Sequence, residues 1–249
     1  MKSLGIDIGS RTIKTVLLSE NGIEQWEVAD ATSRPSEIAG KMLAKHNNIT
    51  VVATGYGRHL LEIEGIPSVT EIKACARGVH RLFNDARLII DIGGQDLKVI
   101  SLDEKGKIAK FEMNDRCAAG TGRFLEIMAE KLNYKISDFG DAALNGREGI
   151  NISSLCTVFA ESEVIGLINR DEPAEDIAYA VHQSAIKKIS GMYKRISSSS
   201  HLPAHLVGGG ALNHAIRKLL EKELHTTVIV PDNPQIIIAL GAGIIASEK

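Results

Sequence analysis

Residues 4–22 read LGIDIGSRTIKTVLLSENG, and residues 88–106 read LIIDIGGQDLKVISLDEKG. The two stretches align without a gap, and the alignment keeps the apolar alternation, the Asp-Ile-Gly triplet, one lysine and the final glycine. A chance match rarely preserves charge, glycine and hydrophobic pattern together. Because self-similarity along a chain is the signature of repeated structural units, the sequence predicts two lobes that share one plan.

Each copy of the repeat has the pattern of three antiparallel strands. An apolar strand ends in Asp-Ile-Gly, and two further strands follow, separated by a turn that ends in glycine. These second and third strands are expected at 13–18 and 24–28, and at 97–102 and 108–113. Helical periodicity is found at 36–45, 71–83, 122–132, 158–169, 174–197, 211–224 and 235–246, and short apolar runs at 50–54, 204–207 and 227–230 predict further strands. This order predicts an α/β protein of two lobes with a cleft between them.

The charge balance excludes some classes of partner. The chain has 249 residues, with 29 Lys and Arg against 31 Asp and Glu and a net charge of −2. Binders of nucleic acid or of anionic membranes usually carry a basic excess, so neither partner is expected. No apolar run reaches the roughly 18–20 residues that span a bilayer, and MKSLGIDIGS lacks the apolar core of a signal peptide. We expect a soluble, cytoplasmic protein.

The two Asp-Ile-Gly turns are candidate phosphate-binding turns. A glycine at such a turn lets backbone N–H groups approach an anion, and a nearby serine or lysine adds a donor or a positive charge. An aspartate at the end of each strand can hold Mg²⁺ through water. Either turn alone could be an ordinary connection between two strands, but the presence of two such turns favours a triphosphate site. The candidates are Asp7, Gly9, Ser10 and Lys14, then Asp91, Gly93 and Gly94, with Gln95 either orienting the attacking water or serving as a polar turn residue.

A third glycine cluster comprises Gly208, Gly209 and Gly210, between a predicted strand and a predicted helix. Taken with the two Asp turns in the same order, it resembles the adenosine motif of the superfamily of acetate and sugar kinases, heat-shock chaperones and actin. The resemblance implies ATP or ADP with Mg²⁺, and the actin-like ATPase fold of duplicated ribonuclease H-like lobes with a nucleotide cleft. The first lobe is then expected at 1–85, completed by a connecting helix at 235–249, and the second at 86–234.

Two cysteines precede predicted helices. A helix N-terminus stabilises a thiolate, which suits Cys117 and Cys156 as metal ligands, although buried packing is the ordinary role of a lone cysteine. Two thiolates are too few for an iron–sulfur cluster, and no CxxC or histidine spacing completes a zinc site. A two-fold dimer supplies each cysteine twice, enough for one [4Fe–4S] cluster per homodimer. Cys75 lies inside a predicted helix and is expected to pack in the core.

Four longer motifs resemble one family over nearly the whole chain. They are ATGYGR at 53–58, IDIGGQDLKVI at 90–100, MNDRCAAGTGRFLE at 113–126 and SSLCTVFAESEV at 153–164. They resemble the ATP-dependent activators of 2-hydroxyacyl-CoA dehydratases, called archerases, and the ATPase subunits of benzoyl-CoA reductases and double-cubane-cluster reductases. The resemblance implies a homodimer whose interface carries one [4Fe–4S] cluster on Cys117 and Cys156. It also implies ATP-coupled transfer of single electrons from a ferredoxin or flavodoxin to a dehydratase or reductase component.

Other interpretations of the same residues stay open at this point. A sugar-type kinase of the same superfamily would have no cluster, and its cysteines would be structural. A nucleotide-gated scaffold of the actin or chaperone kind is the alternative that is not an enzyme. Glu161 and Glu163, one turn after Cys156, either contact a partner or the hinge between the lobes, or belong to a solvated helix face.

Overall fold

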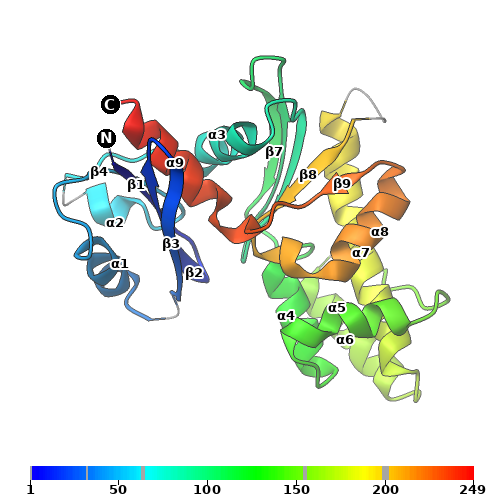
Figure 1. Ribbon diagram of the computed structural model, residues 1–249. Helices are drawn as coiled ribbons and strands as arrows, with labels where there is room; N and C mark the ends of the chain where they lie inside the picture. The colour runs from blue at the N-terminus through cyan, green and yellow to red at the C-terminus, as the bar shows by residue number, and fades with distance from the viewer. Residues whose placement is uncertain (1, 32, 63–64, 154–155, 198–201) are drawn as a thin grey trace. The chain divides into compact units, whose positions relative to one another are not determined.

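The computed structural model describes residues 2–31, 33–62, 65–153, 156–197 and 202–249 (Figure 1). The chain forms two compact units. Unit 1 comprises Met1–Arg87, Leu102–Ala109 and Asp232–Lys249, and unit 2 comprises Leu88–Ser101 and Lys110–Pro231. Each unit is built around one mixed sheet, as the repeat in the sequence predicts.

Unit 1 has a four-stranded sheet in the order β3 (Gly22–Asp30), β2 (Thr12–Ser19), β1 (Ser3–Ile8) and β4 (Thr50–Thr54). β1 pairs antiparallel with β2 and parallel with β4, and every residue of β1 is buried. The helices of this unit are α1 (Pro35–Leu43), α2 (His59–Glu62), α3 (Glu71–Leu82) and α9 (Ile237–Ser247). The apolar helix α9 packs on β1, β2 and β4 and lies beside α3 (Figure 1).

Unit 2 repeats this arrangement and extends it. Its sheet has the order β7 (Ile108–Asn114), β6 (Leu97–Leu102), β5 (Leu88–Ile92), β8 (Ala204–Val207) and β9 (Val228–Ile229). β5 pairs antiparallel with β6 and parallel with β8, as β1 pairs with β2 and β4. The first four strands therefore match unit 1 in order and direction.

The helices of unit 2 enclose its main hydrophobic core. They are α4 (Gly122–Lys131), α5 (Ile136–Asn145), α6 (Thr157–Ile168), α7 (Ala174–Ile196) and α8 (His214–Leu224). α4, α5 and α6 pack together and against α7, the longest of them (Figure 1). Their buried side chains form one cluster with those of β5 and β6.

Four helical segments differ from the sequence prediction. The short helix α2 was not predicted. α5 was not predicted, because Ser137, Asp138 and Gly140 are weak helix formers. It exists through burial of Phe139, Ala142 and Ala143. The helix expected at 211–224 is a short 3₁₀ turn, η1 (Gly209–Leu212), followed by α8, and the one expected at 235–246 begins with η2 (Pro234–Ile236) before α9.

The turn between β6 and β7 belongs to unit 1, although both strands lie in the sheet of unit 2. Asp103 closes this turn, its carboxylate accepting hydrogen bonds from Lys105 N at 2.9 Å and Lys107 N at 2.8 Å. Gly106 has a φ of 70°, and a side chain there would collide with the ring of His80 on α3. The turn therefore packs directly on α3.

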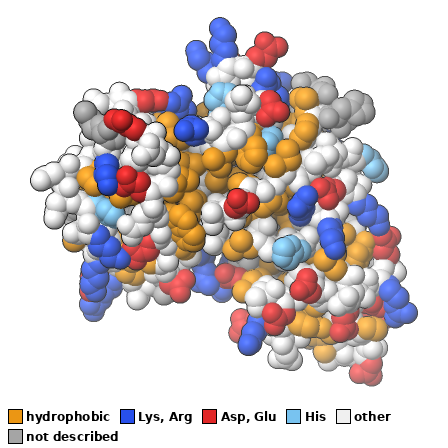
Figure 2. Space-filling model, viewed as in Figure 1, with side chains coloured by type: hydrophobic (Ala, Val, Ile, Leu, Met, Phe, Trp, Pro, Cys, Tyr) orange, Lys and Arg blue, Asp and Glu red, His pale blue; other side chains and the backbone are white. Residues whose placement is uncertain are grey.

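The face of the molecule drawn in Figure 2 has no dominant charge. Figure 2 shows Lys and Arg interspersed with Asp and Glu over the visible face, which agrees with the net charge of −2. Within the part of the chain that the structure describes, no helix combines the length and apolar character required to cross a bilayer.

Candidate functional site

The first Asp-Ile-Gly turn connects β1 to β2. Gly9 N donates to Thr12 O at 3.1 Å, which shapes the turn. Asp7 and Lys14 lie opposite each other in the sheet, and Lys14 Nζ is 3.0 Å from Asp7 Oδ2. The side chains of Asp7 and Lys14 are 4% and 14% exposed. A carboxylate in so buried a position is held by its ion pair.

The second turn, between β5 and β6, has the same geometry and one more carboxylate. Gly93 N donates to Asp96 O at 2.9 Å. Lys98 Nζ is 3.2 Å from Asp91 Oδ2 and 2.6 Å from Asp96 Oδ2, and the Lys98 side chain is 2% exposed. Asp7 and Lys14 balance each other in charge, whereas Asp91, Lys98 and Asp96 together carry one net negative charge. The second turn is therefore the better place for a cation.

A glycine turn lies against each of these aspartates. Gly55, after β4, has a φ of 96°, and a Cβ there would lie 2.5 Å from Asp7 Oδ1 and 2.5 Å from Ile8 O. Gly208, after β8, has a φ of 84°, and a Cβ there would lie at the same distances from Asp91 Oδ1 and Ile92 O. Only glycine fits both the backbone conformation and the space.

Sequence reasoning singled out Gly208 but missed Gly55, Lys98 and Asp96 as site residues. The signal was present, because Lys98 aligns with Lys14 in the repeat and Gly55 lies in the ATGYGR motif. The sequence did not show that β4 pairs in parallel with β1. This pairing places Gly55 against Asp7, just as the pairing of β8 with β5 places Gly208 against Asp91.

The remaining predicted nucleotide residues lie in or beside these turns. Ser10 and Gly94 are half-buried, Gln95 is exposed, and Gly209 and Gly210 form the start of η1. The second turn also contacts α4: Gly122 N donates to Gly93 O at 2.9 Å, and Arg123 N donates to Gly94 O at 2.8 Å. The first residues of α4 are thus hydrogen-bonded to the carbonyls of a predicted phosphate turn.

The two predicted ligand cysteines differ in position. Cys117 is half-buried in the segment between β7 and α4, and its carbonyl accepts a hydrogen bond from Asn114 Nδ2 at 2.8 Å. Turn 118–121 separates it from α4, whose N-cap is Thr121. Cys156 is exposed and is itself the N-cap of α6. Residues 154 and 155 of the SSLC motif lie outside the described residues.

Glu161 and Glu163 are half-buried, and both make contacts within this chain. Glu161 Oε1 is 2.8 Å from Lys131 Nζ of α4. Glu163 accepts hydrogen bonds from Ser153 N at 2.9 Å and Ser153 Oγ at 3.1 Å. The sequence did not reveal this contact between Ser153 and α6.

The described residues contain no cluster of three or more His, Cys, Asp or Glu arranged to hold a metal ion. None of the three cysteines is in a disulfide, and Cys75 is fully buried on α3, which confirms its packing role.

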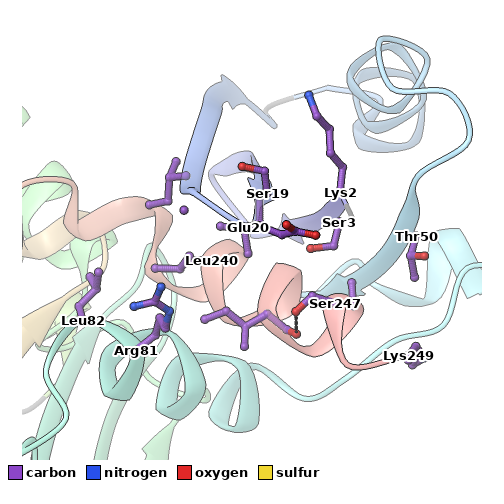
Figure 3. A pocket seen from close by; sticks show the side chains of 15 residues that line it. Lys2, Ser3, Ser19, Glu20, Thr50, Arg81, Leu82, Leu240, Ser247 and Lys249 are labelled. Carbon is purple, nitrogen blue, oxygen red and sulfur yellow. Dashed lines mark hydrogen bonds between the residues drawn. The ribbon is translucent and has the colours of Figure 1, made fainter.

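A cavity of about 570 Å³ in unit 1 lies away from these turns (Figure 3). It is lined by Lys2 and Ser3 at the start of β1, by the end of β2, and by residues of α3 and α9. β1 begins at this cavity and ends at Asp7 and Ile8, so the cavity and the Asp7 turn are at opposite ends of the strand. No predicted site residue lines it.

The chain is similar to proteins of one known family. The family model described as the BadF/BadG/BcrA/BcrD ATPase family matches residues 4–246. The 2-hydroxyisocaproyl-CoA dehydratase activator of Clostridioides difficile is 40% identical, over 100% of this chain and 96% of the relative.

Two solved structures resemble the whole chain. An activator of the 2-hydroxyisocaproyl-CoA dehydratase from Clostridium difficile with bound ADPNP has a TM-score of 0.89 at 39% identity, covering 100% of this chain and 95% of the other. Component A of the Acidaminococcus fermentans (R)-2-hydroxyglutaryl-CoA dehydratase has a TM-score of 0.91 at 34% identity, covering 100% and 98%. The predicted actin-like ATPase fold is confirmed by these likenesses.

Proposed function

The chain belongs to the BadF/BadG/BcrA/BcrD ATPase family, and from this we propose that it is an ATP-driven activator of a partner enzyme. ATP binding and hydrolysis would be coupled to the transfer of single low-potential electrons from a ferredoxin or flavodoxin. The partner would be a 2-hydroxyacyl-CoA dehydratase, or alternatively a double-cubane-cluster or other reductase component. The relatives named as dehydratase activators support this choice of partner. The proposed place of action is the cytoplasm.

One observation carries the proposed coupling. The carbonyls of Gly93 and Gly94 accept hydrogen bonds from the first two residues of α4, Gly122 N at 2.9 Å and Arg123 N at 2.8 Å. A shift of this turn between ATP-bound and ADP-bound states moves the start of α4 with it. Turn 118–121 joins Cys117 to α4, so the same shift would reach the segment proposed to hold the cluster. A switch of this kind needs nucleotide states that favour different conformations.

The nucleotide is assigned to the glycine and aspartate turns. Phosphoryl transfer depends mainly on positioning and on stabilising charge, which backbone N–H groups and lysine supply. The neutral pair of Asp7 and Lys14 suits phosphate, and the excess negative charge around Asp91 suits Mg²⁺, which would neutralise phosphate charge when bound. The proposed residues are Gly9, Ser10, Lys14, Gly93 and Gly94 for phosphate, Gly208, Gly209 and Gly210 for adenosine, Asp7 and Asp91 for Mg²⁺ and its waters, and Gln95 for the attacking water.

The surface around Cys156 supports a homodimer. α6 starts at this cysteine and exposes a face of large apolar side chains, with Val158 at 66% and Phe159 at 65% exposure, followed by Ile165 and Ile168. An apolar helix face of this kind marks an interaction site. A second copy of the chain is the proposed occupant, because a [4Fe–4S] cluster needs four thiolates and one chain offers Cys117 and Cys156. The cluster, when bound, would supply a one-electron carrier.

Iron analysis tests this proposal. Anaerobically purified protein is expected to be a dimer by light scattering and to contain about two iron and two acid-labile sulfide per chain. C117A and C156A should lose the iron and keep nucleotide binding, whereas C75A, which changes a packing cysteine, should keep both. A metal-free protein that phosphorylates a sugar would contradict the proposal and favour the kinase. D91N should hydrolyse ATP slowly while retaining iron, and unchanged hydrolysis would refute the assignment of Asp91.

A further inference from the structure

His182 is a fully buried histidine of α7 with a hydrogen-bond partner on each ring nitrogen. Nδ1 lies 2.8 Å from the carbonyl oxygen of Ala178, one turn earlier in the helix. Nε2 lies 2.9 Å from Nδ2 of Asn213. The ring packs against Phe139 of α5, with the centroids 4.8 Å apart. This histidine is not among the site residues predicted from the sequence.

Asn213 determines the tautomer of His182. Asn213 is the N-cap of α8, and its Oδ1 accepts from Ala215 N at 3.0 Å and Ile216 N at 3.2 Å. Backbone N–H groups only donate, so the atom that faces them is the oxygen, and the NH₂ group faces His182. His182 Nε2 therefore accepts, and the ring proton is on Nδ1, where it donates to Ala178 O. Only the neutral ring satisfies both contacts.

Burial keeps His182 in this neutral form. Removal from water lowers the pKa of His182 to about 4, against the opposing effect of the hydrogen bond to the Ala178 carbonyl. The ring is therefore an acceptor for Asn213 throughout the neutral pH range.

Asn213 connects this histidine to the glycine turn. Its backbone N donates to Gly210 O at 3.2 Å, and Ala211 N donates to Gly208 O at 3.3 Å. Gly208 lies directly against Asp91, as described above. A continuous set of contacts thus runs from α7 through the cap of α8 to the turn and the end of β5.

We propose that His182 is a positioning residue for nucleotide binding: through Asn213 it fixes the turn at 208–212 against the strand end that carries Asp91. This inference rests on the proposed function, which assigns adenosine to the same turn. Without an acceptor at Nε2, the amide of Asn213 loses a partner in a half-buried place. It must then rotate away from the cap or move the turn to find another partner. Either response displaces Gly208 and Gly210 and weakens binding of ATP and ADP alike.

Two substitutions at the same position separate the two contacts. In H182Q, an amide oxygen takes the place of Nε2 and can still accept from Asn213. In H182N, the shorter amide reaches the place of Nδ1, so it keeps the contact with Ala178 and loses the one with Asn213. Both variants lose the ring that packs on Phe139, so both should have a lower melting temperature than the original protein. Calorimetric titration with ADP should give a dissociation constant about tenfold higher for H182N and within about threefold of the original for H182Q.

The outcomes decide between positioning and simple packing. Equal affinities for H182N and H182Q, at whatever melting temperature, would overturn the proposal. N213S offers a second test that preserves folding, because serine is a good N-cap but has no NH₂ group for His182. It should raise the ADP dissociation constant and the KM for ATP with little change in kcat, and an unchanged KM would again overturn the proposal.

G210A separates failure of this inference from failure of the proposed site. A methyl group at Gly210 would collide with the side chain of Ile92, so it distorts the turn whatever His182 does. Normal ADP binding by G210A would show that the nucleotide binds elsewhere, and both proposals would fall. Loss of binding in G210A with normal binding in H182N would overturn only the role of His182.

Discussion

Gly55 lies so close to Asp7 that a Cβ on the glycine would come within 2.5 Å of the carboxylate oxygen Oδ1. Gly208 has the same relationship to Asp91. In each unit, a glycine from the neighbouring parallel strand covers the aspartate at the end of the first strand. Each Asp-Ile-Gly turn therefore has a second component that its own sequence does not contain. This component is the glycine that follows the neighbouring parallel strand, β4 in unit 1 and β8 in unit 2.

Substituting Gly55 should be far more harmful than substituting Gly22. Both glycines have a positive φ, 96° and 108°, so alanine pays a similar backbone cost of about 1 kcal/mol at either place. At Gly22 nothing lies within 4 Å of the added methyl, whereas at Gly55 the methyl meets Asp7. G55A should lose nucleotide binding, measured by ADP titration, and G22A should keep it. Equal affinities in the two variants would contradict the role of the close approach.

The buried lysine of unit 2 should contribute strongly to stability. In K98M, Asp91 and Asp96 lose the ammonium group that lies between them, and breaking a buried ion pair costs about 3–5 kcal/mol. The control is K45M, which removes the exposed pair of Lys45 with Glu27 and should cost at most about 1 kcal/mol. Urea unfolding measures both changes in free energy. A loss in K98M as small as that in K45M would show that the buried carboxylates do not need this lysine.

His182 should make the protein less stable in mild acid. Its pKa falls from the usual 6.5 to about 4 on folding, so below pH 6.5 the unfolded chain binds a proton that the folded chain excludes. The free energy of unfolding therefore decreases as the pH falls through 6.5 towards 4. Between pH 7.5 and pH 5, this one group should cost about 2 kcal/mol. The measurement is the difference in unfolding free energy between the original protein and H182Q at the two pH values, because the carboxylates titrate alike in both. A difference that does not change with pH would contradict this prediction.

A charge on the exposed face of α6 should dissociate the proposed dimer. Phe159 is 65% exposed and lies three residues after Cys156, the N-cap of α6, so F159E would place a carboxylate in the proposed apolar interface. Light scattering should give a monomer with reduced iron content. W26E, at a 46% exposed position on β3, is the matched control and should stay dimeric. A dimeric, iron-loaded F159E would exclude this face as the interface.

Most strands could be predicted well from the sequence, because those in the middle of each sheet are short apolar runs that end at a turn. Strand β4 and strand β8 have the bounds that their apolar runs predict. Helix α5 escaped prediction since its stability comes from the burial of Phe139 against other elements, which no local pattern reports. The start of α8 was placed too early because a 3₁₀ turn has nearly the same spacing of apolar residues as an α-helix.

The candidate site divides in the same way. The aspartates, the glycines and the cysteines belong to local motifs and were identified from the sequence as candidates. Asp96 lies within the motif at 90–100, and His182 belongs to no motif; the importance of both comes from what folding brings next to them, Lys98 in one case and Asn213 in the other. The sequence marked Glu163 as a candidate contact residue, but only the structure shows that it accepts hydrogen bonds from Ser153. Long-range hydrogen bonds of this kind have no signature in a single sequence.

The turn between β6 and β7 shows that the halves of the sequence are not the halves of the molecule. The chain passes from one unit to the other after Arg87, after Ser101, after Ala109 and again after Pro231. No single cut can yield two fragments that each contain a whole unit. A fragment that carries the first copy of the repeat and ends before residue 88 would lack α9, which packs on β1, β2 and β4, whereas residues 88–231 contain the whole of unit 2. A cut between the two copies of the repeat would therefore separate β1 and β2 from α9, the helix that covers them in unit 1.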